Sequence, residues 1–536
     1  MKPLPAKTLM VLGMTAAALI VPESPVDAGL TDITETQPAI VGGQIGKSLQ
    51  QQIGAGQGDV NTPGASIYLI KRDPARSIRR GRQLFHRKFT RDQGHGPRAS
   101  ANSIGNIQLT PRLGAGLADS CTACHARPKG SAGFGGDVVT RPDTRDAPHL
   151  FGLGLIEMLA DEITANLRGI RNHAHDQARI KRAPVTLPLA AKGIEYGSIT
   201  VFPDGSVDTS QVKGVNPDLR VRPFFHHGST ASIREFVIGA FKDEMGLESP
   251  DPLLCAATDS SNPIRVQSPS GMVFDPKLDR VERPPVCQPG EDGDFDGVAN
   301  EIDPALIDHL EFYLLNYFKP GRGEITQDAE QGLKLIQKIG CTSCHLQNLT
   351  IKRDRRVADL ETAHDPDKGI FNRLFATLTA RFAVQPDGNT YPQLLPAGEA
   401  FVVENIFADF KRHDLGPNFH ERNYDGTLTK EFMTEPLWGV GSTSPYGHDG
   451  RSINLKEVIL RHGGEAQAAR DAFAALGENR QRKVVDFLET LVLFPPEETA
   501  SNLNPGNPGT TNPQDPAEHG GVTLGVLFQI PAEGAE

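Results

Sequence analysis

Long hydrophobic runs and cysteines are both scarce in this chain of 536 residues, which contains only six cysteines. Beyond the apolar run from Thr8 to Val21, no stretch approaches the length of a membrane-spanning helix, so we expect no membrane span. That run follows two lysines and precedes small residues at 26–28, a pattern typical of a cleaved signal peptide at residues 1–28. The sequence therefore predicts an exported protein.

Positive charge is also in deficit, because 55 Lys and Arg residues stand against 66 Asp and Glu, giving a net charge of −11. Such a surface repels a phosphate backbone, so no nucleic acid is expected as a partner. It suits docking of a basic electron carrier, although solubility alone explains it equally well.

The chain contains two copies of one pentapeptide pattern. They are Cys-Thr-Ala-Cys-His at 121–125 and Cys-Thr-Ser-Cys-His at 341–345. In C-x-x-C-H, two thiols form thioether bonds to haem and the histidine binds its iron. The alternatives are a disulfide or a zinc knuckle, but zinc would need a second ligand pair close by, and neither copy has one. The sequence predicts two covalently bound c-type haems, hence a redox protein that matures in the bacterial periplasm. The predicted haem residues are Cys121, Cys124, His125, Cys341, Cys344 and His345.

Two cysteines, Cys255 and Cys287, remain outside the motifs. In an oxidising compartment this even remainder predicts a disulfide that closes a loop of about thirty residues and contributes ~3 kcal/mol. The alternative is two free thiols.

Further similar segments accompany the two motifs, and one pair, the Pro-aromatic segments, is separated by nearly the same number of residues as the motifs. A stretch with helical spacing and a central glycine precedes each copy, at 77–89 and 328–339. Pro-Phe-Phe-His-His-Gly at 223–228 and Pro-Tyr-Gly-His-Asp-Gly at 445–450 each precede an amphipathic stretch. We interpret this as a tandem duplication. The expected fold is mainly α, with two tandem cytochrome c-like haem domains, loop-rich insertions and a connector.

The expected domains follow from these boundaries. They are a signal peptide at 1–28, a loosely ordered lead-in at 29–76, an N-terminal haem domain at 77–246, a connector at 247–303, a C-terminal haem domain at 304–498 and a flexible tail at 499–536, with a short strand at 522–530.

The connector contains an acidic twelve-residue stretch, 292–303, with glycine at its sixth position. Its oxygen ligands recur at alternate positions, which is the register of a calcium loop, except that aspartate replaces the final glutamate. The alternative is an acidic, solvated turn. The predicted calcium ligands are Asp292, Asp294, Asp296, Val298, Asn300 and Asp303.

Taken together, the two motifs, Arg-Asp-Ala-Pro-His-Leu-Phe-Gly-Leu-Gly-Leu-Ile-Glu at 145–157, Glu-Pro-Leu-Trp-Gly-Val-Gly at 435–441 and His-Asp-Gly-Arg at 448–451 are similar to a known family. The chain resembles the bacterial di-haem cytochrome c peroxidase superfamily over roughly 77–495, in particular its di-haem oxidoreductase (putative peroxidase) branch. The resemblance implies that the second haem accepts electrons from a small cytochrome or cupredoxin and that the first reduces hydrogen peroxide. The alternatives are a plain electron-transfer protein and a maturation enzyme that oxidises protein side chains.

The resemblance also implies ligands on the far side of each iron. For the second haem it places His462 where the family has methionine, with Met433 and His413 as rivals and an ordinary surface histidine as the alternative. For the first haem the matching position is Ala240, so no ligand is expected there. His149, His226 and His227 are candidates to cap that iron or line its pocket.

Catalytic and supporting residues are carried over in the same way. Glu244 is the expected acid–base for peroxide and Glu157 a second candidate, while Phe236 stands where the family has a helper glutamine. Arg451 is expected to pair with a haem propionate because guanidinium binds carboxylate bidentately, and Arg145 is a weaker candidate. Trp438 is expected either to assist electron transfer or to pack in the core.

Overall fold

This computed structural model describes residues 48–96, 118–127, 131–138, 143, 145–284, 286–292, 298–357, 382–386, 392–396, 400–423, 425–493, 503–504 and 521–522. It is 38% helical and 13% strand, so the fold is more mixed than the mainly helical class that the sequence predicts. The helices are α1 (Leu49–Ile53), α2 (Ser66–Arg72), α3 (Pro74–His86), α4 (Leu153–Lys181), α5 (Ile233–Ala240), α6 (Pro252–Thr258), α7 (Pro304–Leu315), α8 (Gln327–Lys338), α9 (Leu455–Arg461), α10 (Gln467–Ala474) and α11 (Glu478–Glu489).

The strands pair locally and antiparallel. The β3 (Val185–Ala191), β4 (Ile194–Val201) and β5 (Val207–Asp208) strands form a three-stranded sheet. Two-stranded pairs are β1 (Asp137–Val138) with β2 (Arg145–Asp146), β6 (Val266–Gln267) with β7 (Val273–Phe274), β8 (Leu349–Ile351) with β11 (Phe401–Val403), β9 (Phe382–Pro386) with β10 (Pro392–Pro396), β12 (Arg412–Asp414) with β15 (Glu431–Met433), β13 (Glu421–Arg422) with β14 (Leu428–Thr429), and β16 (Leu503–Asn504) with β17 (Gly521–Val522).

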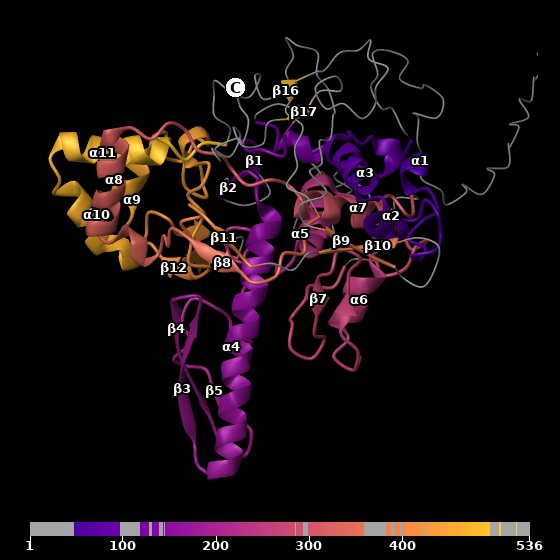
Figure 1. The fold of residues 1–536 in the computed structure, drawn as a ribbon, viewed down its shortest axis with the longest axis horizontal. Helices are drawn as coiled ribbons and strands as arrows, with labels where there is room; N and C mark the ends of the chain where they lie inside the picture. Colours follow the sequence, from indigo (N-terminus) through magenta and orange to yellow (C-terminus); the bar gives the residue numbers. More distant parts are fainter. Residues whose placement is uncertain are drawn as a thin grey trace, which may run out of the picture.

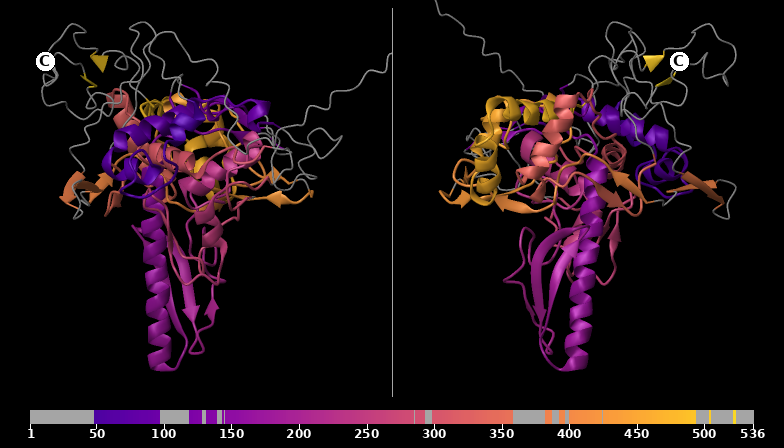
Figure 2. Two further views of the ribbon diagram at one scale, coloured as in Figure 1. Left: turned by 90° about the vertical axis from the view of Figure 1, so that its right-hand side faces the viewer. Right: turned by 60° about the vertical axis from the view of Figure 1, so that its left-hand side comes forward.

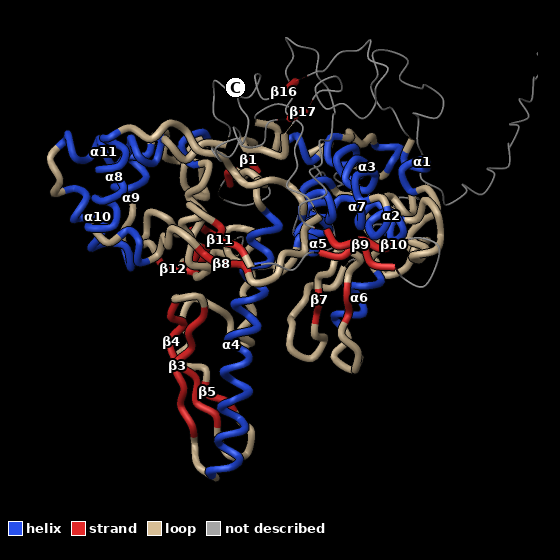
Figure 3. Tube along the Cα trace, in the orientation of Figure 1, coloured by secondary structure: helices blue, strands red, loops and turns tan. Residues whose placement is uncertain are grey.

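Two helical lobes stand on either side of a projecting stalk (Figure 1). One lobe contains α1–α3, α5 and α7, and the other contains α8–α11. The stalk is α4, whose 29 residues span about 44 Å. The β3–β5 sheet packs along its outer part (Figure 3). Two further views show the stalk leaving one side of the body (Figure 2). The sequence did not predict this stalk, which is inserted between residues 148 and 223.

The same five-part unit is present in both lobes. A helix, α3 or α8, leads to a 3₁₀ turn, η3 (Cys121–Ala123) or η5 (Cys341–Ser343). An isolated bridge then closes the Pro-aromatic segment, Phe224 with Thr230 and Tyr446 with Ser452. A capped helix follows, with Ser232 before α5 and Asn454 before α9. A last helix, α7 or α11, crosses the first.

Both helix crossings depend on a glycine. A Cβ on Gly81 would lie 2.1 Å from the carbonyl oxygen of His309 in α7, and one on Gly332 would lie 1.8 Å from that of Lys483 in α11. Each glycine therefore permits a close helix crossing that a side chain would block.

Replacing Gly332 by alanine should destabilise the protein by about 1–3 kcal/mol, because the methyl group meets backbone that cannot move cheaply. Thermal unfolding measures this. Gly169→Ala in α4 is the control, since a Cβ there meets nothing within 4 Å. It should be neutral or stabilising by about 0.5–1 kcal/mol. Equal effects of the two substitutions would contradict a tight crossing at Gly332.

A buried charged cluster joins α5, α6 and α7 in the first lobe. Arg234 is fully buried and contacts Asp251 at 2.6 Å, Asp308 at 2.8 Å and Glu311 at 2.9 Å. Asp251 also caps α6 by accepting from the amide of Leu254. One guanidinium thus holds three elements of the core together.

Several expected boundaries differ from the structure. The helix α7, expected in the second haem domain, shares the core of α3 and α5, because Gly81 opens α3 to it. Residues 48–76, expected to be loosely ordered, form α1, α2 and the start of α3, with Leu49, Leu69 and Ile70 buried. The connector also packs, burying Leu254 of α6 and Phe274 of β7.

The predicted disulfide is confirmed. Cys255 and Cys287 are bonded, with their Cα atoms 5.7 Å apart. Among the described helices, none is long and apolar enough to cross a membrane. Of the strand expected at 522–530, only Val522 lies in the described part, where it pairs with Leu503.

Candidate haem-binding sites

The two C-x-x-C-H motifs have the same local geometry. In each, the amide of the histidine donates to the carbonyl of the first cysteine at 3.0 Å, which folds the pentapeptide into one turn. Cys121, Cys124, Cys341 and Cys344 form no disulfide and are partly exposed. Within each motif the two cysteines are therefore not bonded to each other in this structure.

The motif histidines each present one free ring nitrogen. Nδ1 of His125 donates to the carbonyl of Pro148 at 2.8 Å, and Nδ1 of His345 donates to that of Phe407 at 3.0 Å. This bond fixes the tautomer in which Nε2 carries a lone pair, the form that binds a metal. Burial lowers the pKa of His125 to about 4 and also lowers that of His345. Both residues therefore fit an iron ligand.

His462 follows α9 and has the same arrangement. Its Nδ1 donates to the carbonyl of Val458 at 2.7 Å, and burial lowers its pKa to about 4, with further lowering from nearby His345. The Phe419 ring packs edge-on against it, at 5.3 Å between centroids. The imidazole is thus neutral, buried and near His345. His462 as the sixth ligand stays a prediction, and the geometry favours it.

The rival ligands are engaged elsewhere. His413 lies between Asp409, at 2.8 Å from Nε2, and Glu465, at 2.9 Å from Nδ1. Burial alone would lower its pKa, but hydrogen bonds to Asp409 and Cys344 raise the pKa to about 11. A protonated ring has no lone pair for iron. Met433 places its sulfur against Gly228, where a Cβ would lie 2.8 Å away.

Cys344, Asp409 and His413 form the one metal-like group found among the described residues. Because Cys344 belongs to the second motif and His413 is held by two carboxylates, this group forms the wall of that haem site. The sequence analysis did not single out Asp409, because no recognisable motif surrounds it.

The three histidines proposed for the first iron lack a free nitrogen. His149 accepts from the amide of Phe151 at Nδ1 and donates from Nε2 to the carbonyl of Trp438 at 3.0 Å. His226 contacts Glu435 and the carbonyl of Asp146. His227 contacts Arg145 through both ring nitrogens and Glu421 through Nε2. These histidines therefore join the two halves of the chain, and their ring nitrogens are engaged in those contacts.

Glu244 lies close to the first motif in the fold. It occupies a π-helical turn, η4 (Phe241–Met245), that directly continues α5. Its backbone carbonyl accepts from the amide of Ala118, three residues before Cys121. Its side chain is half-buried. Phe236, within α5, packs against Phe225 with the rings tilted and their centroids 5.1 Å apart.

Glu157, the second catalytic candidate, is held by structural partners. It is 2% exposed, and its two oxygens accept from the amide of Ile233 at 2.6 Å and from Arg355. Burial raises its pKa to about 7. The contacts tie the start of α4 to the start of α5, which is a stabilising role.

The arginine candidates differ in availability. Arg145 is buried and paired with Glu421 at 2.8 Å, so it is committed to the contact between the halves. Arg451 is 56% exposed and lies 3.5 Å from Asp449 and 3.7 Å from Asp143, which leaves most of its guanidinium open. Trp438 is 3% exposed in the core, and its ring lies against Gly152.

Only part of the predicted calcium loop can be placed, because Asp294 and Asp296 lie outside the described residues. The side chain of Asp303 caps α7 by accepting from the amide of Ala305, and Asn300 accepts from the amide of Gly290. Asp292 and Val298 are described at the two edges of the gap. A calcium ion there stays a prediction.

Comparison with known proteins agrees with the resemblance in the C-terminal part. The family model "Di-haem oxidoreductase, putative peroxidase" matches residues 379–491, a segment that contains His462 and begins after the second C-x-x-C-H motif. No curated protein matches the chain.

Among solved structures, the chain is similar to one titled "Kuenenia stuttgartiensis Hydrazine Synthase Pressurized with 20 bar Xenon". The identity is 16% and the TM-score 0.22, over 37% of this chain and 59% of that one. Residues 379–491 therefore carry the sequence pattern of the di-haem oxidoreductases, and the chain is similar to that family through this segment.

Proposed function

We propose that this chain is an exported di-haem oxidoreductase that reduces hydrogen peroxide at a first haem with electrons relayed through a second. In this proposal each five-part unit is a cytochrome c-like haem domain. The observation that carries the proposal is that both motif histidines are half-buried, neutral and bonded through Nδ1, which leaves Nε2 for iron.

The proposal assigns haem attachment to the four motif cysteines and electron supply to a separate protein. Cys121 and Cys124 would tether one haem, and Cys341 and Cys344 the other, in thioether bonds. Haem, when bound, supplies one-electron transfer and the iron chemistry that cleaves peroxide. The overall reaction takes two electrons and two protons for each hydrogen peroxide and gives two waters. A small periplasmic cytochrome or cupredoxin would supply the electrons.

A continuous hydrogen-bonded route between the two motif histidines supports the relay. Nδ1 of His125 donates to Pro148, whose neighbour His149 donates to the carbonyl of Trp438. Leu437, next to Trp438, donates to Ile406 at 3.1 Å, and the neighbouring Phe407 accepts from His345. The route has four hydrogen bonds and short covalent stretches only. It gives His149 and Trp438 a connecting role.

Glu244 is the residue proposed to move the proton. Its place near the first motif suits a group that takes a proton from peroxide and returns it to the departing oxygen. Glu244→Gln should lower kcat for peroxide by about 10²–10⁴-fold while leaving both haems attached. Stopped-flow spectra with peroxide and steady-state turnover with a reduced cytochrome measure this.

Asp243→Asn is the matched control, because Asp243 lies next to Glu244 but faces Lys242 at 3.4 Å. It should leave kcat unchanged. If neither the wild type nor the variants change spectrum or turn over with peroxide, the chain is an electron carrier and the proposed peroxidase function is wrong.

His462→Met should raise the reduction potential of the second haem by on the order of 100 mV or more, because a thioether stabilises reduced iron better than a second imidazole. Redox titration followed at the haem absorption bands measures the change. An unchanged potential and spectrum would show that His462 is not the ligand. His420→Met is a control, since His420 is already paired with Asp414 at 2.8 Å.

A calcium ion at 292–303 is part of the proposal. Asp303 and Asn300 already order both the start of α7 and the turn at Gly290. A bound ion there would rigidify the packed connector below the first lobe.

A further inference from the structure

A wide cleft lies beside the stalk, away from both C-x-x-C-H motifs. Its volume is about 820 Å³, within the range of small-molecule sites. One wall is the middle of α4, and the other is the segment from 265 to 279 that contains β6 and β7. The end of α2 and residues 353–357 close it. None of the lining residues belongs to the haem sites described above.

The lining is strongly basic on a protein that is acidic overall. Three aspartates face seven cationic side chains, which are Lys71, Arg168, Arg171, Arg220, Arg265, Arg353 and Arg355. The net charge of the chain is −11, so this surplus of positive charge is local. A concave basic surface concentrates anions.

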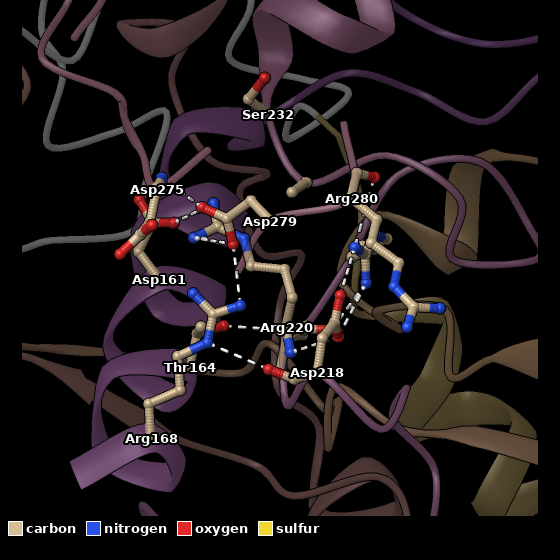
Figure 4. A network of polar contacts seen from close by, with 12 residues as sticks. Asp161, Thr164, Arg168, Asp218, Arg220, Ser232, Asp275, Asp279 and Arg280 are labelled. Atoms are coloured by element: carbon tan, nitrogen blue, oxygen red, sulfur yellow. Dashed lines mark hydrogen bonds and ion pairs between the residues drawn. The ribbon is translucent and has the colours of Figure 1, made fainter. Parts of the chain in front are cut away.

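Part of the positive charge is used internally. Asp279 lies between Arg168, at 2.9 Å, and Arg220, at 3.8 Å, and Asp161 lies 3.0 Å from Arg220 and 3.2 Å from Arg355 (Figure 4). These pairs hold the guanidinium groups in place along α4. Two of the three aspartates in the cleft, Asp161 and Asp279, are therefore neutralised by these ion pairs, which also position the cleft wall.

Other polar groups in the cleft have no such partner. Lys71 and Arg171 form no ion pair with any described residue. Burial lowers the pKa of Lys71, and burial together with nearby Arg168 lowers the pKa of Arg171, although Asp218 and Asp275 act in the opposite direction. Ser270 is 8% exposed, and its hydroxyl has no hydrogen-bond partner in the described part of the chain. Partly desolvated cations and an unpaired buried hydroxyl are features of a site built for an anion.

We propose that this cleft binds a small organic or inorganic polyanion with at least two carboxylate or phosphate groups, held by Lys71, Arg171 and Ser270. The paired arginines Arg168 and Arg220 would support those contacts. The inference is independent of the peroxidase proposal, because it uses no haem residue.

The test is calorimetric titration of citrate and of pyrophosphate into the full-length holoprotein at constant ionic strength. Saturable binding of at least one probe is expected. Arg171→Gln and Lys71→Gln should each weaken that binding at least tenfold, as expected for loss of a charge-assisted hydrogen bond. Ser270→Ala should weaken it less. Circular dichroism and haem absorption report that each variant is folded.

Arg179→Gln is the matched control, because Arg179 lies on the same helix but is exposed and paired with Asp176. Its binding should equal that of the wild type. Preference for pyrophosphate would identify phosphates as the natural class, and preference for citrate would identify carboxylates. Absence of saturable binding, or equal weakening by Arg179→Gln, would overturn the proposal and leave the arginines a structural role only.

Discussion

Replacing Cys341 and Cys344 together by serine is expected to remove one of two covalent haems and leave the other. A serine hydroxyl forms no thioether, and His345 alone cannot keep a macrocycle through purification. The first motif uses separate residues, so its haem should remain. Intact-protein mass and haem absorbance per polypeptide measure the change in material matured in a periplasm.

The matched control for that variant is Cys255→Ser with Cys287→Ser, which also removes two sulfurs but belongs to the disulfide. It should lose stability, about 3 kcal/mol for a loop of this length, and keep both haems. Wild-type protein without any covalent haem, or a motif variant with two, would refute the central interpretation of the C-x-x-C-H motifs.

The haem attachment residues could be predicted because their chemistry is local. A pentapeptide contains both thiols and the histidine, and no distant contact is needed to place them. The groups that orient the histidines are different. Pro148 lies 23 residues after His125, whereas Phe407 lies 62 residues after His345. Because the insertions differ in the two halves, no fixed spacing could reveal these carbonyls.

The same limit applies to the histidines considered as candidates for the first iron. Whether a histidine can bind metal depends on the partner of its second nitrogen, and that partner comes from far along the chain. His149 is satisfied by Trp438, 289 residues away, and His226 by Glu435, 209 residues away. The residues of this interface are visible in the sequence, but their pairing is a property of the fold.

Helices could be predicted where a sequence pattern is repeated. The helix against which each one packs could not be predicted, because that depends on the three-dimensional fold. The helices before each motif and the capped helices after each Pro-aromatic segment followed from spacing. The helix α7 is buried on all sides, so its sequence does not show which of its faces contacts α3. Its partner α3 is selected through Gly81, which only the three-dimensional crossing shows.

Replacing Arg234 by methionine is expected to destabilise the first lobe by about 3–5 kcal/mol at pH 7, the largest effect on stability that we expect from a single substitution. Methionine fills a similar volume, but it leaves Asp251, Asp308 and Glu311 buried near one another without their shared cation. Ser66 and Ser268 hydrogen-bond two of these carboxylates but bring no charge. Denaturant unfolding of the holoprotein measures the free energy, and Arg179→Met should change it by less than about 0.5 kcal/mol.

The pH dependence of the Arg234→Met effect distinguishes lost charge from lost packing. Burial already raises the pKa of Asp251 and Glu311, while Arg234 lowers it. Without the guanidinium these pKa values rise further above those of the unfolded chain, so the folded variant binds more protons as the pH falls. By linkage its stability then increases relative to the wild type, and the deficit should shrink between pH 7 and pH 5. A deficit that stays constant over that interval would mean that packing around Arg234, and not its charge, holds α5, α6 and α7 together.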